Sequence, residues 1–332
     1  MLEIKDLHVR FHGSDHDAVG GISLTVADGQ IMGLVGESGS GKTVTAMVIS
    51  GLMPQRRADI SGQVLLDGKD LLALSPADMR KRQGCAISVV FQEPMSAMNP
   101  VMRIGPQVEE ALRVHTKLSP QERRERALQA LRDVDLPDAE AIYDKYPHQM
   151  FGGMLQRAMI AAAIISRPKL LLADEPTTAL DVTVQAQILD LLRDIQRRLH
   201  TSTILVSHDL GVVARAADRV AIMYAGRIVE IGTAEEVYYD PRHPYTQGLL
   251  RSLPALARCH GALHTIPGMP PTLIDPPEGD AFACRNPQAL AIDYQRQPPM
   301  FRVSDTHYAA TWLLDPRAPK LAPLPEGEEH YV

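Results

Sequence analysis

The chain has 332 residues, of which 45% are apolar and 22% charged, and its formal net charge is −6. This length can bury a sizeable core and suggests about two domains, while the acidic balance argues against nucleic acid as the main partner. No apolar run approaches the ~18 residues of a membrane-spanning helix, and the start lacks a secretory signal, so we expect a cytoplasmic protein. Cys85, Cys259 and Cys284 are too far apart for a disulfide framework or a four-thiolate metal site.

The first third of the chain predicts strands around a glycine-rich loop. Alternating apolar residues over 2–11 and 22–35 indicate short strands, with a turn at Asp28-Gly29 in the second stretch. A helix is expected directly after the loop, over VTAMVISGLM. A strand pair around SGQVLLDGKD and a buried strand, ISVVFQ, follow. We therefore expect an antiparallel β subdomain beside the start of an α/β core.

The rest of the chain divides by periodicity and composition. Residues 93–165 are helical in pattern and predict a helical subdomain, with QERRERALQALRDV as its amphipathic helix. Strands and helices alternate again from KLLLADEP to RVAIMYAGRIVEIG, which predicts an α/β sheet with covering helices. Most of the 25 prolines follow residue 240. We therefore predict a nucleotide-binding domain at 1–240 and a proline-rich, irregular C-terminal extension at 241–332.

The strongest motif is the glycine-rich loop GESGSGKT. It fits G-x-x-x-x-G-K-[ST] and lies between an apolar strand and a helical pattern, which is the context that a phosphate-binding loop requires and a chance glycine-rich turn lacks. Successive N–H groups at such a helix start surround phosphate oxygens, the lysine reaches the β and γ phosphates, and the threonine hydroxyl serves Mg²⁺. The residues expected to bind nucleotide here are Gly36, Ser38, Gly39, Ser40, Gly41, Lys42 and Thr43.

A second strand end supplies two carboxylates. The run LLLADE predicts a buried parallel strand that ends at Asp174 and Glu175. Active groups in open α/β sheets lie at the carboxyl ends of strands, so both are expected near the phosphate loop. Asp174 suits the hydration shell of Mg²⁺, and Glu175 can polarise an attacking water. An acidic strand end is common by itself, but beside a complete phosphate loop it indicates hydrolysis.

These motifs together resemble the nucleotide-binding subunit of an ABC transporter, a P-loop ATPase. The resemblance assigns Gln92 to the loop that contacts Mg²⁺ and water, and His208 to the switch histidine near the γ-phosphate. It assigns Asp181 to the loop that crosses to a partner subunit, and Phe11 to the aromatic that stacks on adenine. The alternatives are a surface glutamine, a structural strand-end histidine and a core aromatic, the last applying most strongly to Phe11.

One motif departs from that family. The stretch HQMFGGMLQR aligns with the signature Leu-Ser-Gly-Gly-Gln, so Phe151 occupies the serine position before Gly152 and Gly153. In the family two subunits enclose two ATP molecules, and each signature binds the γ-phosphate held by the other subunit. We expect Phe151 to weaken the site lent to the partner, which implies a heterodimer with a second ATPase chain. In the alternative, Phe151 turns aside into the helical subdomain and the site works normally.

The C-terminal extension indicates a particular group within that family. HPYTQGLLRSLP and IPGMPPTL resemble the C-terminal region of ATPases from oligopeptide, dipeptide and nickel importers, in which Met154 in place of the signature glutamine is usual. This implies an ATP-hydrolysing subunit, peripheral at the cytoplasmic face of the membrane, that powers peptide import with two permease subunits and an extracytoplasmic solute-binding protein. The alternatives are an importer of nickel or another small solute, a soluble ABC ATPase acting on nucleic acid or ribosomes, and a subunit that binds ATP without hydrolysing it.

The ATPases of these importers often carry four cysteines in the C-terminal extension that bind an iron–sulfur cluster. The aligned positions in this chain are Asp280, Asn286, Asp293 and Thr311. Such clusters are held by cysteine thiolates, and Cys284 lies off the expected position. We therefore predict that no cluster forms and that proline-rich packing holds the extension instead.

Overall fold

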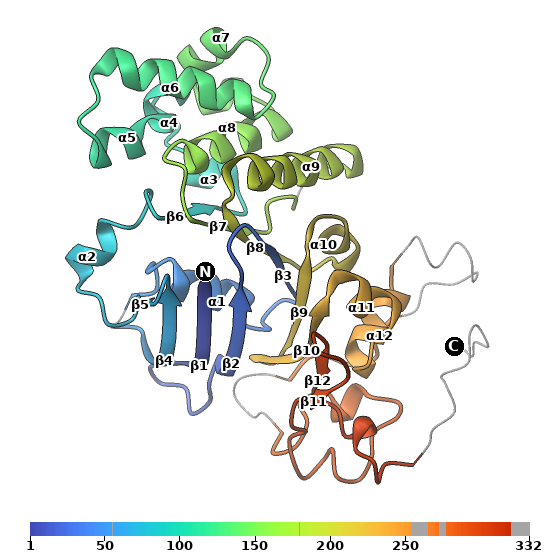
Figure 1. Ribbon diagram of the computed structural model, residues 1–332. Helices are drawn as coiled ribbons and strands as arrows, with labels where there is room; N and C mark the ends of the chain where they lie inside the picture. The colour runs from blue at the N-terminus through green and yellow to red at the C-terminus, as the bar shows by residue number, and fades with distance from the viewer. Residues whose placement is uncertain (55, 179, 254–264, 272–276, 320–332) are drawn as a thin grey trace.

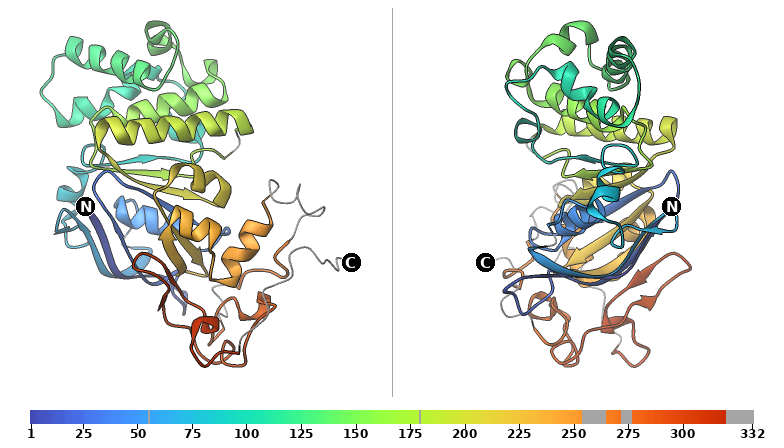
Figure 2. Two further views of the ribbon diagram at one scale, coloured as in Figure 1. Left: turned by 45° about the vertical axis from the view of Figure 1, so that its right-hand side comes forward. Right: turned by 90° about the vertical axis from the view of Figure 1, so that its left-hand side faces the viewer.

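The computed structural model describes residues 1–54, 56–178, 180–253, 265–271 and 277–319. Two sheets form the middle of the molecule (Figure 1). A group of helices lies at one end and the C-terminal segments lie at the other, an arrangement that all the views share (Figure 2). The fold is thus an α/β core with a helical part and a C-terminal part attached at opposite ends.

The smaller sheet is antiparallel, with strand order β2-β1-β4-β5. Its strands are β1 (Leu2–Phe11), β2 (Val19–Val26), β4 (Ala58–Leu66) and β5 (Lys69–Asp70). Alternate apolar side chains of these strands are buried, as the pattern of alternating apolar residues predicted. The short helix α2 (Pro76–Arg80) follows this sheet, and the Ser75 hydroxyl caps its start by accepting from the Asp78 N–H.

The larger sheet has the order β11-β12-β10-β9-β3-β8-β7-β6. Its five parallel strands are β3 (Ile31–Val35), β6 (Ile87–Val90), β7 (Leu170–Asp174), β8 (Ser202–Ser207) and β9 (Arg219–Tyr224). They are almost continuously buried because helices pack around them. Helices in contact with these strands include α1 (Lys42–Ile49) and α10 (Leu210–Ala216). The carboxyl ends of β3, β7 and β8 therefore meet along one edge of the sheet.

The helical part extends from α3 to α8 and includes mostly short helices. Its elements are α3 (Pro94–Ala97), α4 (Ile104–Val108), α5 (Glu110–His115), α6 (Pro120–Asp133), α7 (Ala139–Asp144), a 3₁₀ turn (Pro147–Gln149) and α8 (Gly152–Ile164). Ser119 and Glu122 form a capping box that starts α6, which explains where the amphipathic segment begins. The long α9 (Val182–Leu199) packs below α8 and joins this part to the core.

The C-terminal extension consists of short elements joined by loops, and it continues the larger sheet. After β10 (Arg227–Thr233) come α11 (Ala234–Tyr239), α12 (Pro244–Arg251), a 3₁₀ turn (Ala283–Arg285), β11 (Phe301–Arg302), β12 (Tyr308–Ala309) and a 3₁₀ turn (Trp312–Leu314). Strand β12 pairs with β10 and β11 pairs with β12, both antiparallel. The extension therefore shares a sheet with the nucleotide-binding core.

Polar contacts join the extension to the core. Buried Glu230 of β10 accepts the N–H groups of Arg242 and His243, and its Oε1 lies 2.7 Å from His307 Nε2. Glu236 accepts from the hydroxyls of Ser304 and Thr306, among other donors. Burial raises the pKa of Glu236, but these hydrogen bonds outweigh it and lower the pKa to about 2. Two carboxylates, Glu230 and Glu236, therefore hold the extension to the core.

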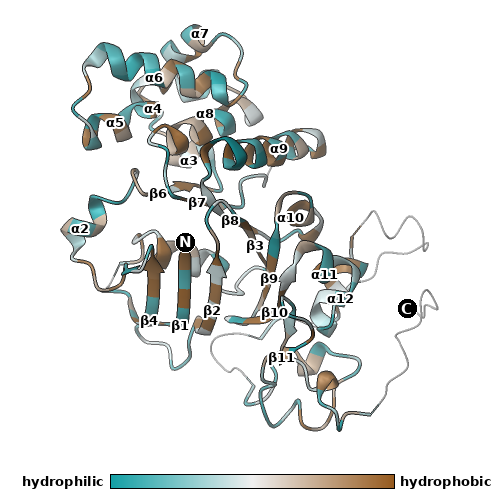
Figure 3. Ribbon diagram, viewed as in Figure 1, coloured by the Kyte–Doolittle hydropathy of each residue, from teal (hydrophilic) through white to brown (hydrophobic). Residues whose placement is uncertain are grey.

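Apolar residues concentrate in the strands, and the outward faces of α6 and α9 are hydrophilic (Figure 3). Among the described residues, no helix combines the length and the apolar character needed to cross a bilayer.

Candidate functional site

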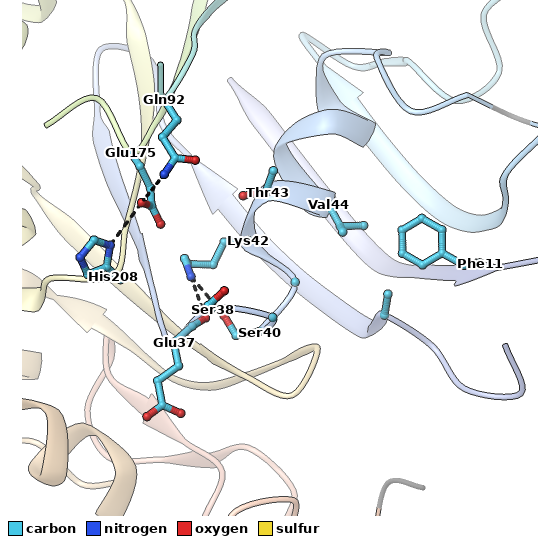
Figure 4. A pocket seen from close by; sticks show the side chains of 13 residues that line it. Phe11, Glu37, Ser38, Ser40, Lys42, Thr43, Val44, Gln92, Glu175 and His208 are labelled. Carbon is cyan, nitrogen blue, oxygen red and sulfur yellow. Dashed lines mark hydrogen bonds and ion pairs between the residues drawn. The ribbon is translucent and has the colours of Figure 1, made fainter. Parts of the chain in front are cut away.

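A cavity of about 610 Å³ opens at the carboxyl ends of the parallel strands (Figure 4). The glycine-rich loop between β3 and α1 forms one wall, as the motif predicted. Gly41 caps α1 with a φ of 99°, a left-handed conformation that side chains rarely adopt, which explains the glycine at this point of the loop. The residues that line the cavity are Phe11, Ala18, Glu37, Ser38, Gly39, Ser40, Gly41, Lys42, Thr43, Val44, Gln92, Glu175 and His208.

Lys42 lies at the centre of the loop and is only 4% exposed. Its Nζ donates to the carbonyl oxygens of Gly36 at 2.7 Å and Glu37 at 2.9 Å. Burial lowers the pKa of Lys42, and the nearby carboxylates, Glu175 foremost, oppose that shift. The loop thus presents a cation at the bottom of the cavity, where phosphate oxygens would take over its contacts.

Of the two carboxylates at the end of β7, Glu175 lines the cavity and Asp174 contacts the start of α1. Thr43 Oγ1 donates to Asp174 Oδ1 at 3.3 Å, which joins the helix start to the strand end. Burial raises the pKa of Asp174, while the hydrogen bond from Thr43 lowers it. A half-buried carboxylate beside a threonine hydroxyl is an oxygen donor set of the kind that Mg²⁺ prefers.

Two other segments converge on Glu175, and a residue of its own loop also contacts it. Gln92 Nε2 donates to Glu175 Oε2 at 3.2 Å, His208 Nδ1 lies 3.3 Å from the same oxygen, and Thr178 Oγ1 donates to it at 2.9 Å. The backbone of Glu175 has a φ of 46°, which is uncommon for a residue other than glycine and typical of strained functional positions. The structure therefore brings Gln92, Glu175 and His208 together in one constellation beside Lys42 (Figure 4).

The far end of the cavity is apolar. Phe11, the last residue of β1, is half-buried there near Val44 (Figure 4), and Ala18 also lines the cavity. An aromatic ring next to small apolar side chains at the mouth of a phosphate site can cover one face of a planar base. Phe11 lines the cavity and also packs against the hydrophobic core beneath it.

The signature residues lie outside this cavity. Phe151 caps α8 without a side-chain hydrogen bond and is 80% exposed, so it does not turn aside into the helical part. Gly152 is exposed beside it and Gly153 begins the packing against α9. Asp181 starts α9, where its Oδ1 accepts the Val184 N–H. Residue 179 of the same loop lies outside the described residues. A single chain therefore does not unite its signature with its own phosphate loop.

The four positions aligned with cluster cysteines do not fit an iron–sulfur cluster. Their side chains are buried carboxylate, amide or hydroxyl groups. Each accepts a hydrogen bond from a backbone N–H nearby in the sequence, either two residues later or three residues earlier, and so closes a local turn. They are Asp280, Asn286, Asp293 and Thr311. Cys284 is exposed, and Cys259 lies outside the described residues. No group of three potential metal-ligating side chains occurs among the described residues. Measuring iron in the purified protein tests the prediction.

Sequence reasoning missed several residues of the site. Ala18 and Val44 carry no motif of their own, and they are recognised only when the cavity is formed. Thr178 follows the two carboxylates closely in the sequence, and this proximity was an available signal. Glu37 occupies an unrestricted position of the glycine-rich motif, so nothing in the sequence marked its contacts.

Two models of known protein families match parts of this chain. Residues 19–178 match the model of the family described as ABC transporter, and residues 229–292 match the family described as oligopeptide/dipeptide transporter, C-terminal region. The first match covers the glycine-rich loop, Gln92 and the strand-end carboxylates. The second match covers the start of the extension.

Individual proteins give the same result over nearly the whole chain. The oligopeptide transport ATP-binding protein OppD of Bacillus subtilis is 50% identical over 327 residues, which is 97% of this chain and 91% of that protein. The dipeptide transport ATP-binding protein DppD of Lactococcus lactis is 50% identical over 326 residues, covering 97% and 93%. Among solved structures, the dimeric bacterial ABC transporter cassette MJ0796 is 27% identical with a TM-score of 0.63, covering 70% of this chain and 99% of that one.

Proposed function

The chain belongs to the ABC transporter family, and on this basis we propose that it is the ATP-binding and ATP-hydrolysing subunit that powers peptide import through separate membrane permease subunits. The observation that carries the proposal is the convergence of Gln92, Glu175 and His208 on the cavity formed by the phosphate loop. We infer that the transported solute is a peptide from the names of the relatives and from the matched C-terminal region. This subunit supplies energy and makes no contact with the transported solute.

The residues of the cavity have different roles in ATP binding and hydrolysis. The phosphate loop binds the β and γ phosphates through its N–H groups and Lys42. Glu175 accepts a hydrogen bond from the attacking water and polarises it. The hydrogen bonds from Gln92 and Thr178 to Oε2 hold the carboxylate in place, and His208 lies 3.3 Å from the same oxygen. His208 would contact the γ-phosphate and Phe11 would pack on the base, and both side chains line the cavity.

Mg²⁺ belongs to the same proposal. The oxygen atoms of Thr43, Asp174 and Gln92 would hold it, and the contact between Thr43 and Asp174 supports their assignment because it brings two hard oxygen donors together. Bound there, the ion would neutralise phosphate charge.

The proposed partner is a second, different ATPase chain. ABC cassettes dimerise, as MJ0796 does. Exposed Phe151 and its neighbours Gly152 and Gly153 would face the ATP of the partner, together with the loop at Asp181. The ring replaces a hydroxyl, and a hydrogen bond to a charged group contributes about 1.5–3 kcal/mol, so that site would be degenerate. The site with this chain's phosphate loop and Glu175 would remain competent, provided that the partner has an intact signature.

The assembly would also contain two permease subunits at the cytoplasmic face of the membrane and, indirectly, an extracytoplasmic solute-binding protein. An importer of nickel or another small solute would use the same mechanism, so transport assays with labelled di- and oligopeptides and with nickel discriminate between these cargoes. A soluble ABC ATPase would hydrolyse ATP without permeases.

The substitution Glu175→Gln tests hydrolysis. The amide keeps the shape of the side chain and removes the charge that polarises water, so we expect the ATPase rate to fall at least a hundredfold while ATP still binds. The matched control is Glu235→Gln, an exposed carboxylate of α11 outside the cavity. Turnover at the wild-type rate in Glu175→Gln would refute the assigned role.

Subunit stoichiometry tests the heterodimer. The complex is isolated from native membranes through a tag on this chain and weighed by native mass spectrometry. We expect one copy of this chain and one copy of a different ATPase. Two copies of this chain would contradict the proposal.

A further inference from the structure

The C-terminal extension contacts the phosphate loop directly. Arg285 donates from Nη1 to Glu37 Oε2 at 2.6 Å and from Nη2 to Glu37 Oε1 at 3.0 Å. Two parallel hydrogen bonds between a guanidinium and a carboxylate fix both the distance and the orientation of the pair. Glu37 is the second residue of the glycine-rich motif, so this ion pair joins residues 248 positions apart in the sequence.

Arg285 is itself held firmly. Its side chain is 5% exposed, its Nε donates to the carbonyl of Pro267 at 2.9 Å, and Nη1 also donates to the Tyr224 hydroxyl at 3.2 Å. The guanidinium lies 5.9 Å from the centre of the Phe282 ring. Exposed ion pairs contribute little to stability because solvent screens them, but this arginine is buried and has few alternative partners. Loss of either charge would leave the other poorly compensated.

A second residue of the extension contacts the same loop position. The buried Tyr245 of α12 accepts the Glu37 N–H at its hydroxyl, at 2.8 Å. Its ring packs against Tyr224 with a centroid distance of 4.6 Å and against Phe282 at 5.4 Å. The tyrosine therefore reaches the loop from a rigid aromatic cluster, and it fixes the backbone of residue 37 independently of the carboxylate.

All three polar groups of Glu37 are thus engaged. The N–H donates to Tyr245, the carboxylate pairs with Arg285, and the carbonyl accepts from Lys42. Glu37 lines the nucleotide cavity, yet its side chain points away from Lys42 toward the extension (Figure 4). A carboxylate in a phosphate site repels the ligand unless a cation neutralises it, and Arg285 supplies that cation outside the cavity.

We propose that Arg285 and Tyr245 are positioning residues for ATP binding: they hold the phosphate loop at Glu37 and neutralise the charge of its carboxylate. This inference rests on the proposed ATPase function. It gives the extension a role in the nucleotide site of its own chain. In the opposing interpretation, the same contacts only attach the extension to the core and leave ATP affinity unchanged.

The test measures the Kd of the full-length chain for ATP, by displacement of a fluorescent ATP analogue, in Arg285→Gln, Glu37→Gln and the double variant. We expect Arg285→Gln to weaken ATP binding roughly tenfold or more, because the Glu37 charge is then unpaired beside the phosphates. The double variant lacks that charge and should return to within about threefold of wild type. A purely structural contact cannot produce this rescue, since the double variant lacks the ion pair as well.

The control is Arg317→Gln, which removes an exposed arginine of the extension that pairs with Asp315. Its Kd should equal that of wild type. An unchanged Kd in Arg285→Gln, with a lowered Tm, would overturn the inference, and so would a double variant as weak as Arg285→Gln. If Arg285→Gln fails to fold, Tyr245→Phe removes one hydrogen bond and keeps the ring, and about fivefold weaker binding is expected. A wild-type chain that does not bind ATP would refute the proposed function itself.

Discussion

Replacing Phe151 with serine changes one exposed ring at the start of α8. The ring is 80% exposed, so its removal costs the fold of the chain little, and the serine hydroxyl can cap a helix that has no side-chain cap at present. Caps of this kind contribute about 1 kcal/mol, so the Tm should stay equal or rise. In a dimer, the same hydroxyl would also donate to the γ-phosphate held by the other subunit. That hydrogen bond contributes about 1.5–3 kcal/mol, which strengthens closure roughly ten- to hundredfold.

The assay is sedimentation of this chain together with its partner ATPase in the presence of a non-hydrolysable ATP analogue, which prevents turnover at both sites. The dimer dissociation constant is compared among the wild type, the Phe151→Ser variant and the Phe151→Ala variant. Alanine removes the ring without supplying a hydroxyl, so it separates steric obstruction from the missing hydrogen bond. The ATPase rate of the assembled complex with Phe151→Ser provides a second measurement. Equal dissociation constants and an unchanged rate would show that the ring does not impair the site.

Three further outcomes are expected. Lys42→Ala removes the cation of the phosphate loop and should weaken binding of a fluorescent ATP analogue at least tenfold; unaltered affinity would exclude its role. Gly153→Ala places a Cβ 2.7 Å from Val184 Cγ1 and should lower the free energy of unfolding by about 1–3 kcal/mol in urea titrations. An unchanged free energy of unfolding would show that α9 repacks to make room for the methyl group. Burial and the charge of Asp293 raise the pKa of Asp280 to about 6 despite a backbone hydrogen bond, so its ionisation destabilises the folded state as pH rises from about 4 to about 6. Asp280→Asn should therefore stabilise the protein by about 2 kcal/mol more at pH 8 than at pH 4.5, and equal gains at the two pH values would contradict the assignment.

Much of the nucleotide cavity was predictable because its parts are short contiguous motifs at strand ends. A glycine-rich loop after β3, two carboxylates at the end of β7 and His208 after β8 each have a local pattern. Parallel strands bring their carboxyl ends to one edge, so a prediction of the strands also predicts that these residues meet. The position of Phe11 was harder to predict, because an aromatic at the end of a strand fits a core equally well.

The helical part was also predictable, since a 3.6-residue period and a capping box are local signals. The extension was not. Its strands are two residues long and form only because β10 presents an edge for them. Their attachment depends on carboxylates such as Glu230 that pair with side chains far along the chain. Proline content indicated a change of structure and gave no information about these pairs.

The sequence by itself determined the chemistry of this protein: a phosphate loop, the acidic strand end of an ATPase and a signature in which phenylalanine replaces serine. Those are properties of residue type and short spacing, and they need no knowledge of distant contacts. Only the tertiary structure decided that Phe151 faces solvent, that the extension completes the larger sheet and that Arg285 reaches Glu37 in the phosphate loop. Such contacts join segments up to 248 residues apart, and the burial that gives them their strength exists only once the chain has folded.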